Sequence, residues 1–172
     1  MTKNPRESLQ TECLAWLDTA FTERLIDYWV FGGWAVDFHS GRVTRSHADI
    51  DVAIWLADLT RVVSLLEANG WAPGAQTAED GYLTFDRGAL SLDLAFLACD
   101  DTGRIYTPSS QGEGAWPAGS FGDAQGEIEE GVRCRIVGLE SLIADKSEHR
   151  DDPATAAKDR VDIDALKIVQ AR

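Results

Sequence analysis

Gly32-Gly33-Trp34-Ala35-Val36-Asp37 is followed, after a short gap, by Arg45-Ser46-His47-Ala48-Asp49-Ile50-Asp51. The two glycines end an apolar run, and the two carboxylates stand one residue apart at the start of another. Because a β-strand points alternate side chains to opposite faces, a strand over 49–54 places Asp49 and Asp51 on the same face. This layout indicates chemistry on phosphate groups and metal ions.

A third carboxylate, that of Asp93, belongs to a second alternating segment over 90–96. Its apolar face can pack on a core and leave the carboxylates together on an open face, where like charges repel each other unless a cation joins them. Mg²⁺ takes one or two carboxylates together with waters and phosphates, so the three aspartates and a nucleoside triphosphate can complete the shells of a pair of Mg²⁺ ions. The alternative is ordinary solvent-facing aspartates in half-exposed strands, although Asp is depleted in strands.

The run from Gly32 to Asp51, with Asp93 downstream, resembles the polymerase-β-like nucleotidyltransferase superfamily. The most similar branch contains small enzymes that adenylylate aminoglycosides at the 2″ position or lincosamides. That branch carries G-G-W-x-x-D, then R-x-H-x-D-I-D, then an acidic residue on an adjacent strand, and each element has a literal match here. The resemblance is specific over roughly residues 28–97.

The resemblance implies a site and a donor. Metal ligation falls to Asp49, Asp51 and Asp93, and Asp93 is also the base that takes a proton from the acceptor hydroxyl. Gly32 and Gly33 face the triphosphate of ATP, which donates AMP. A glycine turn that leads into a helix permits this close approach of phosphate.

Basic residues are the next candidates for phosphate contacts. Arg45 could hold a phosphate bidentately or pair with Asp37 or Asp49, and Arg42 has the same alternatives. His47 either orients the loop before Asp49 or fills the turn.

The C-terminal pattern Lys146 … Arg150 … Lys158-Asp159 … Asp162 resembles a signature of several small nucleotidyltransferase families, whose basic residues lie toward the nucleotide phosphates. Lys146 is the first candidate for this role and Lys158 the second. The alternative for Lys146 is a solvated lysine on a helix surface.

Composition limits the class of protein. The net charge of −13 argues against a nucleic-acid surface, which depends on clustered Lys and Arg, and favours cationic small molecules. An acidic composition could also serve solubility alone. No apolar run is long enough to span a membrane and no signal-peptide core is present, so we expect a cytoplasmic protein. Cys13, Cys99 and Cys134 lack the spacing of a zinc site or disulfide framework.

The order of predicted elements is α+β, with a mixed twisted sheet flanked by helices and short C-terminal helices. We expect a single domain over 1–172: a metal and nucleotide half over 1–100, a flexible loop over 101–126, and a hairpin and helices over 127–172. The predicted helices cover 8–26, 34–40, 59–68 with Asp58 as cap, 139–149 and 155–169. The predicted strands cover 28–31, 49–54, 82–85 with a neighbour near Trp71, the Asp93 strand, and a hairpin over 127–137 around Glu130-Gly131.

These observations favour a Mg²⁺-dependent nucleotidyltransferase that moves AMP from ATP to a hydroxyl of a small amine-bearing acceptor, an aminoglycoside or a lincosamide. One alternative is a regulatory or antitoxin-like nucleotidyltransferase that acts on a protein partner, and another is a relative that modifies a cellular metabolite. No large C-terminal helical bundle follows the catalytic half, so acceptor contacts could come from the 102–126 loop or from a second subunit in a homodimer.

Overall fold

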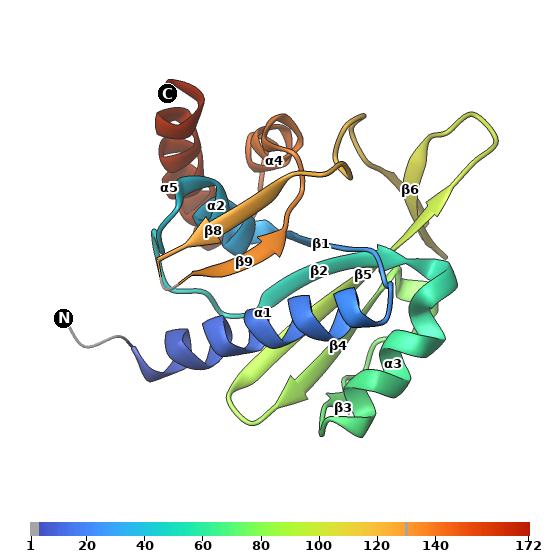
Figure 1. Cartoon of the computed structure of the whole chain (residues 1–172). Coiled ribbons are helices and arrows are strands. Elements are labelled where there is room, and N and C mark those ends of the chain that lie inside the picture. The colour runs from blue at the N-terminus through green and yellow to red at the C-terminus, as the bar shows by residue number, and fades with distance from the viewer. Residues whose placement is uncertain (1–3, 130) are drawn as a thin grey trace.

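The computed structural model describes residues 4–129 and 131–172 as an α+β fold, as expected (Figure 1). The helices are α1 (Pro5–Glu23), α2 (Gly32–Ser40), α3 (Leu59–Ala68), α4 (Leu139–Lys146) and α5 (Pro153–Gln170), and single 3₁₀ turns, η1 and η2, cover Leu56–Asp58 and Ala78–Asp80. The strands are β1 (Tyr28–Phe31), β2 (Ile50–Trp55), β3 (Ala72–Pro73), β4 (Tyr82–Arg87), β5 (Leu90–Cys99), β6 (Ile105–Ser109), β7 (Gly112–Ala115), β8 (Gln125–Ile128) and β9 (Val132–Arg135).

The main sheet is mixed, with the strand order β1-β2-β5-β4-β3. The central pair, β2 and β5, is parallel, and every other pair along this path is antiparallel. The buried residues of β2 and β5, among them Ile50, Val52, Leu92 and Leu94, form the middle of the core. The predicted strands therefore meet at the centre of the fold, where a parallel pair is covered by helices.

The segment over 101–126, predicted as a flexible loop, contains two strands between residues 105 and 115. There β6 and β7 form an antiparallel hairpin, and β6 pairs with the end of β5. The turn into β6 is stabilised by Asp100, whose carboxylate accepts from the backbone N–H groups of Thr102 (2.9 Å) and Arg104 (3.1 Å). Exposed strands rich in Gly, Ser and Pro carry no buried apolar alternation, so the sequence gives no strand signal here.

The first helix begins at Pro5 rather than at residue 8, because the Asn4 side chain accepts from the backbone N–H of Arg6 (3.1 Å) and caps it. Its end is a Schellman turn in which Leu25 adopts a left-handed φ of 53° and Ile26 N–H donates to the Phe21 carbonyl (2.9 Å). The Leu25 side chain is 90% exposed.

Two other helix ends complete the comparison with the predictions. Gly41 closes α2 in the left-handed region (φ 75°), as expected. Asp58 precedes α3 but makes no capping hydrogen bond, because its carboxylate pairs with Arg61 (2.7 Å). The predicted 127–137 hairpin is present as β8 and β9, with Glu130 outside the described residues.

Two of the three cysteines, Cys13 and Cys134, are buried, and burial raises the pKa of each thiol to about 12. Cys99 is exposed at the end of β5, and all three thiols are free. Within residues 4–129 and 131–172, no helix is long and apolar enough to cross a membrane.

Candidate active site

Asp51 and Asp93 lie side by side on the two central parallel strands. Asp51 of β2 is paired in register with Asp93 of β5, and on its other side with Phe31 of β1. Asp49 stands just before β2, and its negative charge acts on both of the other carboxylates. The structure therefore places Asp51 and Asp93 side by side and Asp49 within electrostatic reach of both.

The three carboxylates repel one another in a partly dry environment. Burial raises the pKa of Asp51 to about 8, with smaller contributions from the charges of Asp49 and Asp93. Burial and the charge of Asp49 also raise the pKa of Asp93. A site that disfavours its own negative charge in this way is stabilised by a bound cation.

The donor set fits a magnesium ion that is completed by substrate. Among the described residues, no three His, Cys, Asp or Glu side chains are arranged to enclose a metal by themselves. Mg²⁺ does not need such an enclosure, since it usually takes one or two carboxylates and fills its octahedron with water and phosphate oxygens. The neighbouring carboxylates of Asp51 and Asp93 meet this requirement, and ligation by all three aspartates stays a prediction.

The two glycines are needed for close packing against this site. Gly32 has a φ of 63°, and a Cβ atom there would overlap the Asp51 carboxylate. A Cβ atom on Gly33 would lie 2.5 Å from Nδ1 of His47 and 2.6 Å from Nη2 of Arg45. The pair therefore allows the start of α2 to touch the side chains of the acidic motif, which any larger residue would displace.

His47 ties the loop before β2 to α2. It is buried, its Nε2 lies 2.5 Å from Oδ2 of the fully buried Asp37, and its ring packs at a tilt of 38° against Trp34 with centroids 4.7 Å apart. The other Asp37 oxygen accepts from the backbone N–H (2.9 Å) and hydroxyl (2.5 Å) of Thr44. These contacts orient the segment that carries Asp49 and favour that interpretation of His47 over a filled turn.

Arg45 is paired with a residue that the sequence did not suggest. Its Nε and Nη2 donate to the two carboxylate oxygens of Asp162 on α5, at 2.7 and 2.8 Å. The sequence offers Asp37 and Asp49 as ion-pair partners of Arg45, but the carboxylate that it contacts is that of Asp162. Asp162 stands in the C-terminal pattern quoted above, and that pattern was the only signal, because the pair joins positions far apart in the chain.

Lys146 is not a solvated helix lysine. Its side chain is 10% exposed, and its ammonium lies 3.1 Å from Asp159 and 3.0 Å from Asp162. Its positive charge also opposes the rise in the pKa of Asp51, which places the ammonium within electrostatic reach of that carboxylate. Burial alone would disfavour the charged ammonium, and the ion pairs with Asp159 and Asp162 offset this cost.

Lys158, in contrast, is exposed on α5. Its positive charge contributes to the lowered pKa of Asp152 at the start of that helix. Within the part of the chain that the structure describes, no ion pair joins Lys158 to the cluster around Lys146.

A hollow opens beside Gly32. Cavities of about 80 Å³ and about 540 Å³ share Trp116, Ser141 and Asp145 in their walls, and the smaller one reaches Gly32. The Trp116 indole forms part of the wall and donates to the Thr107 hydroxyl (2.9 Å). The hollow therefore lies between the β6–β7 hairpin and α4, next to the residue that touches Asp51.

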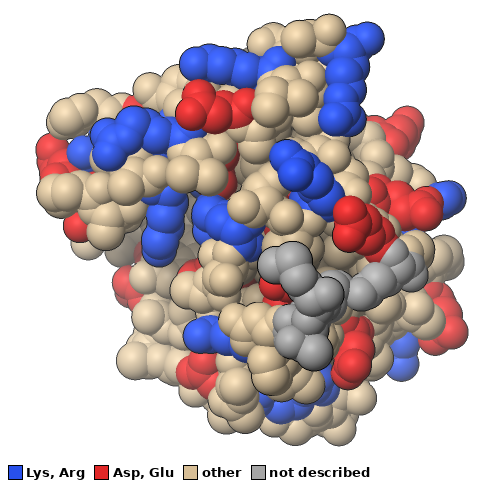
Figure 2. All heavy atoms as spheres, turned by 90° about the vertical axis from the view of Figure 1, so that its left-hand side faces the viewer, with Lys and Arg blue, Asp and Glu red and all other residues tan. Residues whose placement is uncertain are grey.

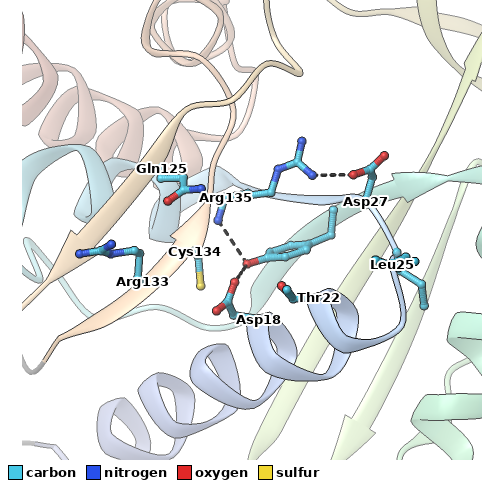
Figure 3. Close-up of a pocket in the computed structure, with 10 residues that line it drawn as sticks. Asp18, Thr22, Leu25, Asp27, Gln125, Arg133, Cys134 and Arg135 are labelled. Atoms are coloured by element: carbon cyan, nitrogen blue, oxygen red, sulfur yellow. Dashed lines mark hydrogen bonds and ion pairs between the residues drawn. The ribbon is translucent and has the colours of Figure 1, made fainter.

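A separate cavity of about 570 Å³ lies at the end of α1 (Figure 3). Its wall includes Tyr28, whose hydroxyl donates to Asp18 (2.5 Å) and accepts from the backbone N–H of Arg135 (3.2 Å). None of the candidate site residues lines this cavity. This cavity is therefore separate from the candidate site.

Comparison with known proteins gives a consistent result. The family model of aminoglycoside-2″-adenylyltransferases matches residues 14–166. A 2″-aminoglycoside nucleotidyltransferase from Escherichia coli is 54% identical over 33 residues, 19% of this chain and 19% of that protein, so the match spans about a fifth of the relative. A lincosamide resistance protein from Staphylococcus haemolyticus is 29% identical over 101 residues, 54% of this chain and 57% of that protein.

Two solved structures share the fold. The lincosamide antibiotic adenylyltransferase LnuA, solved with lincomycin bound, superposes with a TM-score of 0.73 at 21% identity, covering 91% of this chain and 95% of that one. ANT(2″)-Ia in complex with adenylyl-2″-tobramycin superposes with a TM-score of 0.69 at 22% identity, covering 95% of each chain.

Proposed function

The chain belongs to the aminoglycoside-2″-adenylyltransferase family, and on that basis we propose that it transfers AMP from ATP to a hydroxyl of an aminoglycoside or a lincosamide. The observation that carries the proposal is the register of Asp51 and Asp93 on neighbouring strands, with the pKa of both carboxyls raised. Two such groups at the centre of a sheet are costly unless they bind a cation. A cation held there can neutralise a triphosphate.

In this proposal Asp49, Asp51 and Asp93 hold one or two Mg²⁺ ions. A metal held by these aspartates would neutralise charge on the triphosphate and would lower the pKa of the acceptor hydroxyl. Gly32 and Gly33 leave room for phosphate beside the start of α2. Lys146 supplies positive charge on the phosphate side, and Lys158, exposed on α5, is the second candidate for such a contact.

Asp93 acts as the general base. Its carboxylate takes the proton of the acceptor hydroxyl, the hydroxyl oxygen forms a bond to the α-phosphorus, and the bond from that phosphorus to the departing pyrophosphate breaks in line. The register position of Asp93 beside Asp51 on the central strands supports this role, because it places the carboxylate where the metal and the acceptor hydroxyl would meet.

The acceptor is an amine-bearing small molecule. The net charge of −13 attracts cations, and the hollow between Trp116 and α4 opens beside Gly32 with Asp145 and Glu148 in its wall. The inner part of this hollow measures only about 80 Å³, so in this proposal a second subunit completes the acceptor site. A homodimer is therefore part of the proposal, and light scattering measures it.

The test is a search for the adenylylated product. Purified protein is incubated with ATP, Mg²⁺ and a panel of aminoglycosides, lincosamides and cell-extract proteins, and the products are analysed by mass spectrometry. We expect an antibiotic that is heavier by one AMP unit, and no product when a chelator removes Mg²⁺. AMP on a protein band alone would instead support the regulatory alternative.

The matched control is Asp93→Asn, which removes the base but keeps the shape of the side chain. We expect turnover to fall about 10³-fold while the affinity for ATP falls much less. A variant with a near-normal rate would contradict the assignment of Asp93 as the base.

A further inference from the structure

Asp162 on α5 is a completely buried carboxylate with two cationic partners. Its Oδ1 accepts from Nε of Arg45 (2.7 Å), and its Oδ2 accepts from Nη2 of Arg45 (2.8 Å) and lies 3.0 Å from Nζ of Lys146. Burying a lone carboxylate is expensive, so these two partners are what make its position tolerable. They also lower the pKa of Asp162, which keeps it ionised.

The partners come from separate parts of the chain. Arg45 precedes β2, Lys146 ends α4, and Asp162 belongs to α5. Figure 1 shows α4 and α5 close together beside α2, away from the β3 edge of the sheet. Asp162 is therefore the point at which the C-terminal helices meet the loop that leads to Asp49.

The ion pairs continue in alternating sign beyond Asp162. Lys146 also contacts Asp159 (3.1 Å), Asp159 accepts from Nε of Arg150 (2.9 Å), and Arg150 donates to Asp145 (3.0 Å). Asp159, which is itself held by Arg150, contacts the ammonium of Lys146 in addition to Asp162, so this ammonium has little freedom to move.

Both partners of Asp162 adjoin the carboxylate cluster. Nη1 of Arg45 lies 3.1 Å from Nδ1 of His47, in the segment that ends at Asp49. The positive charge of Lys146 acts on Asp51. Each cation also keeps a donor in reserve, since Lys146 has three N–H groups for two carboxylates and Nη2 of Arg45 has a second hydrogen.

We infer that Asp162 is a positioning residue for nucleotide binding, which holds Arg45 and Lys146 where a triphosphate meets the Asp49, Asp51 and Asp93 carboxylates. This inference rests on the proposed function. It also revises the role of Arg45, which contacts phosphate only in the orientation that Asp162 imposes. A residue far from the acidic motif thereby sets the geometry of the phosphate side of the site.

The test compares nucleotide binding in the wild type, Asp162→Asn and the exposed control Asp164→Asn by calorimetry, with Mg²⁺ and a non-hydrolysable ATP analogue. We expect Asp162→Asn to weaken binding about tenfold or more, and Asp164→Asn to bind as the wild type does. In turnover assays, the KM for ATP should rise about tenfold while kcat falls less than about threefold.

Coupling distinguishes positioning from simple stabilisation. If Asp162 acts through Lys146, the double variant Asp162→Asn/Lys146→Met should lose less nucleotide affinity than the product of the fold losses in the two single variants. A loss in the double variant equal to that product, or an unchanged nucleotide affinity in Asp162→Asn, would overturn the inference.

A milder variant covers the case in which Asp162→Asn fails to fold. Asp159→Asn releases one contact of Lys146 and leaves the Arg45 pair intact, so nucleotide affinity should fall by about threefold. No loss in this variant would count against the inference. If the wild type itself binds no nucleotide, the proposed function fails and the inference fails with it.

Discussion

Asp51 is the residue in which the conflict between folding and chemistry is most visible. Its backbone is fixed near the start of β2 in register with Asp93, and its side chain is packed against Gly32. Its carboxyl accordingly has a pKa of about 8 when no metal is bound. The ionised carboxylate destabilises the metal-free fold at the position where a cation is proposed to bind, and such destabilising groups are common in functional sites.

The pH dependence of the metal-free protein follows from this shift. The pKa of Asp51 is about 8 in the folded state and about 4 in the unfolded chain, so folding takes up a proton between these values and stability falls as the pH rises from 4 to 8. We therefore expect Asp51→Asn to raise the unfolding temperature of the metal-free protein, most strongly near pH 8. The measurement is calorimetric unfolding at pH 5 and pH 8.

The same variant should lose Mg²⁺-dependent ATP binding, which separates stability from function. Asp101→Asn, in an exposed turn, serves as the control and should change neither property. An equal stabilisation by Asp51→Asn at both pH values would contradict the assignment of a raised pKa to this carboxyl.

Leu25 offers a prediction outside the site. It occupies the left-handed position of the Schellman turn after α1, where glycine is favoured, and its side chain gains nothing because it is 90% exposed. Leu25→Gly should raise the free energy of unfolding by about 0.5–1 kcal/mol, because the relief of strain exceeds the added entropy of the unfolded chain. Urea unfolding measures the change, and Leu25→Ala, which keeps the Cβ atom, should show no gain.

At the scale of elements, the β6–β7 hairpin depends on one aromatic anchor. Trp116 follows the hairpin and makes edge contacts with Phe31 (centroids 5.6 Å apart) and Phe121 (4.9 Å), besides its hydrogen bond to Thr107. Of the two hairpin strands, β7 is exposed and β6 is half-buried. Their attachment to the body of the molecule comes from this side chain, from the pairing with β5 and from the η2 turn, where Ser110 N–H donates to the Glu79 carbonyl (2.8 Å).

Trp116→Ala should lower the free energy of unfolding by about 2 kcal/mol and make residues 105–115 more sensitive to proteolysis, because the aromatic contacts are lost. Trp116→Phe keeps a ring but not the hydrogen bond, and should cost about 1 kcal/mol. Urea unfolding and limited proteolysis measure both effects. Stability within about 0.5 kcal/mol of the wild type for Trp116→Ala would show that the indole does not anchor the hairpin.

Elements with a strong local pattern could be predicted from the sequence. The β1 strand, the β2 and β5 strands and the glycine that ends α2 each follow from apolar alternation or turn chemistry within a few residues. The carboxylate cluster was predictable because the two strands carry aspartates at matching positions of the alternation.

Features set by distant contacts could not be predicted in the same way. The β6–β7 hairpin is defined by its pairing with β5 rather than by its own composition. The partner of Arg45 lies on the last helix, and only the folded chain brings Asp162 to it. Burial of Lys146 has the same origin, because a lysine on a short helix carries no sign of what packs over it.

At the scale of the whole molecule, the net charge of −13 is not spread as one uniform field. Figure 2 shows Lys and Arg interspersed with Asp and Glu over the face it presents. The surplus of acidic residues nevertheless acts over about 10 Å in dilute salt, and this range shortens as the salt concentration rises. The attraction should therefore depend on both the charge of the acceptor and the ionic strength.

We expect the KM of a polyamine aminoglycoside to rise severalfold between about 0.05 M and about 0.5 M salt, since screening weakens its attraction to an acidic protein. The KM of a lincosamide, which carries a single amine, should rise much less under the same conditions. Steady-state kinetics with both acceptors measures the difference. Equal slopes would indicate that the overall charge has no role in acceptor binding.

The distribution of the three thiols has a practical consequence. Cys13 and Cys134 are buried and hold their protons, whereas Cys99 is exposed at the last position of β5, opposite Ile105 of β6. A maleimide dye should therefore attach to the unmodified chain at this one position, about 20 Å along the strand from Asp93. Its fluorescence would report movement of the hairpin as substrates bind, without any engineered cysteine.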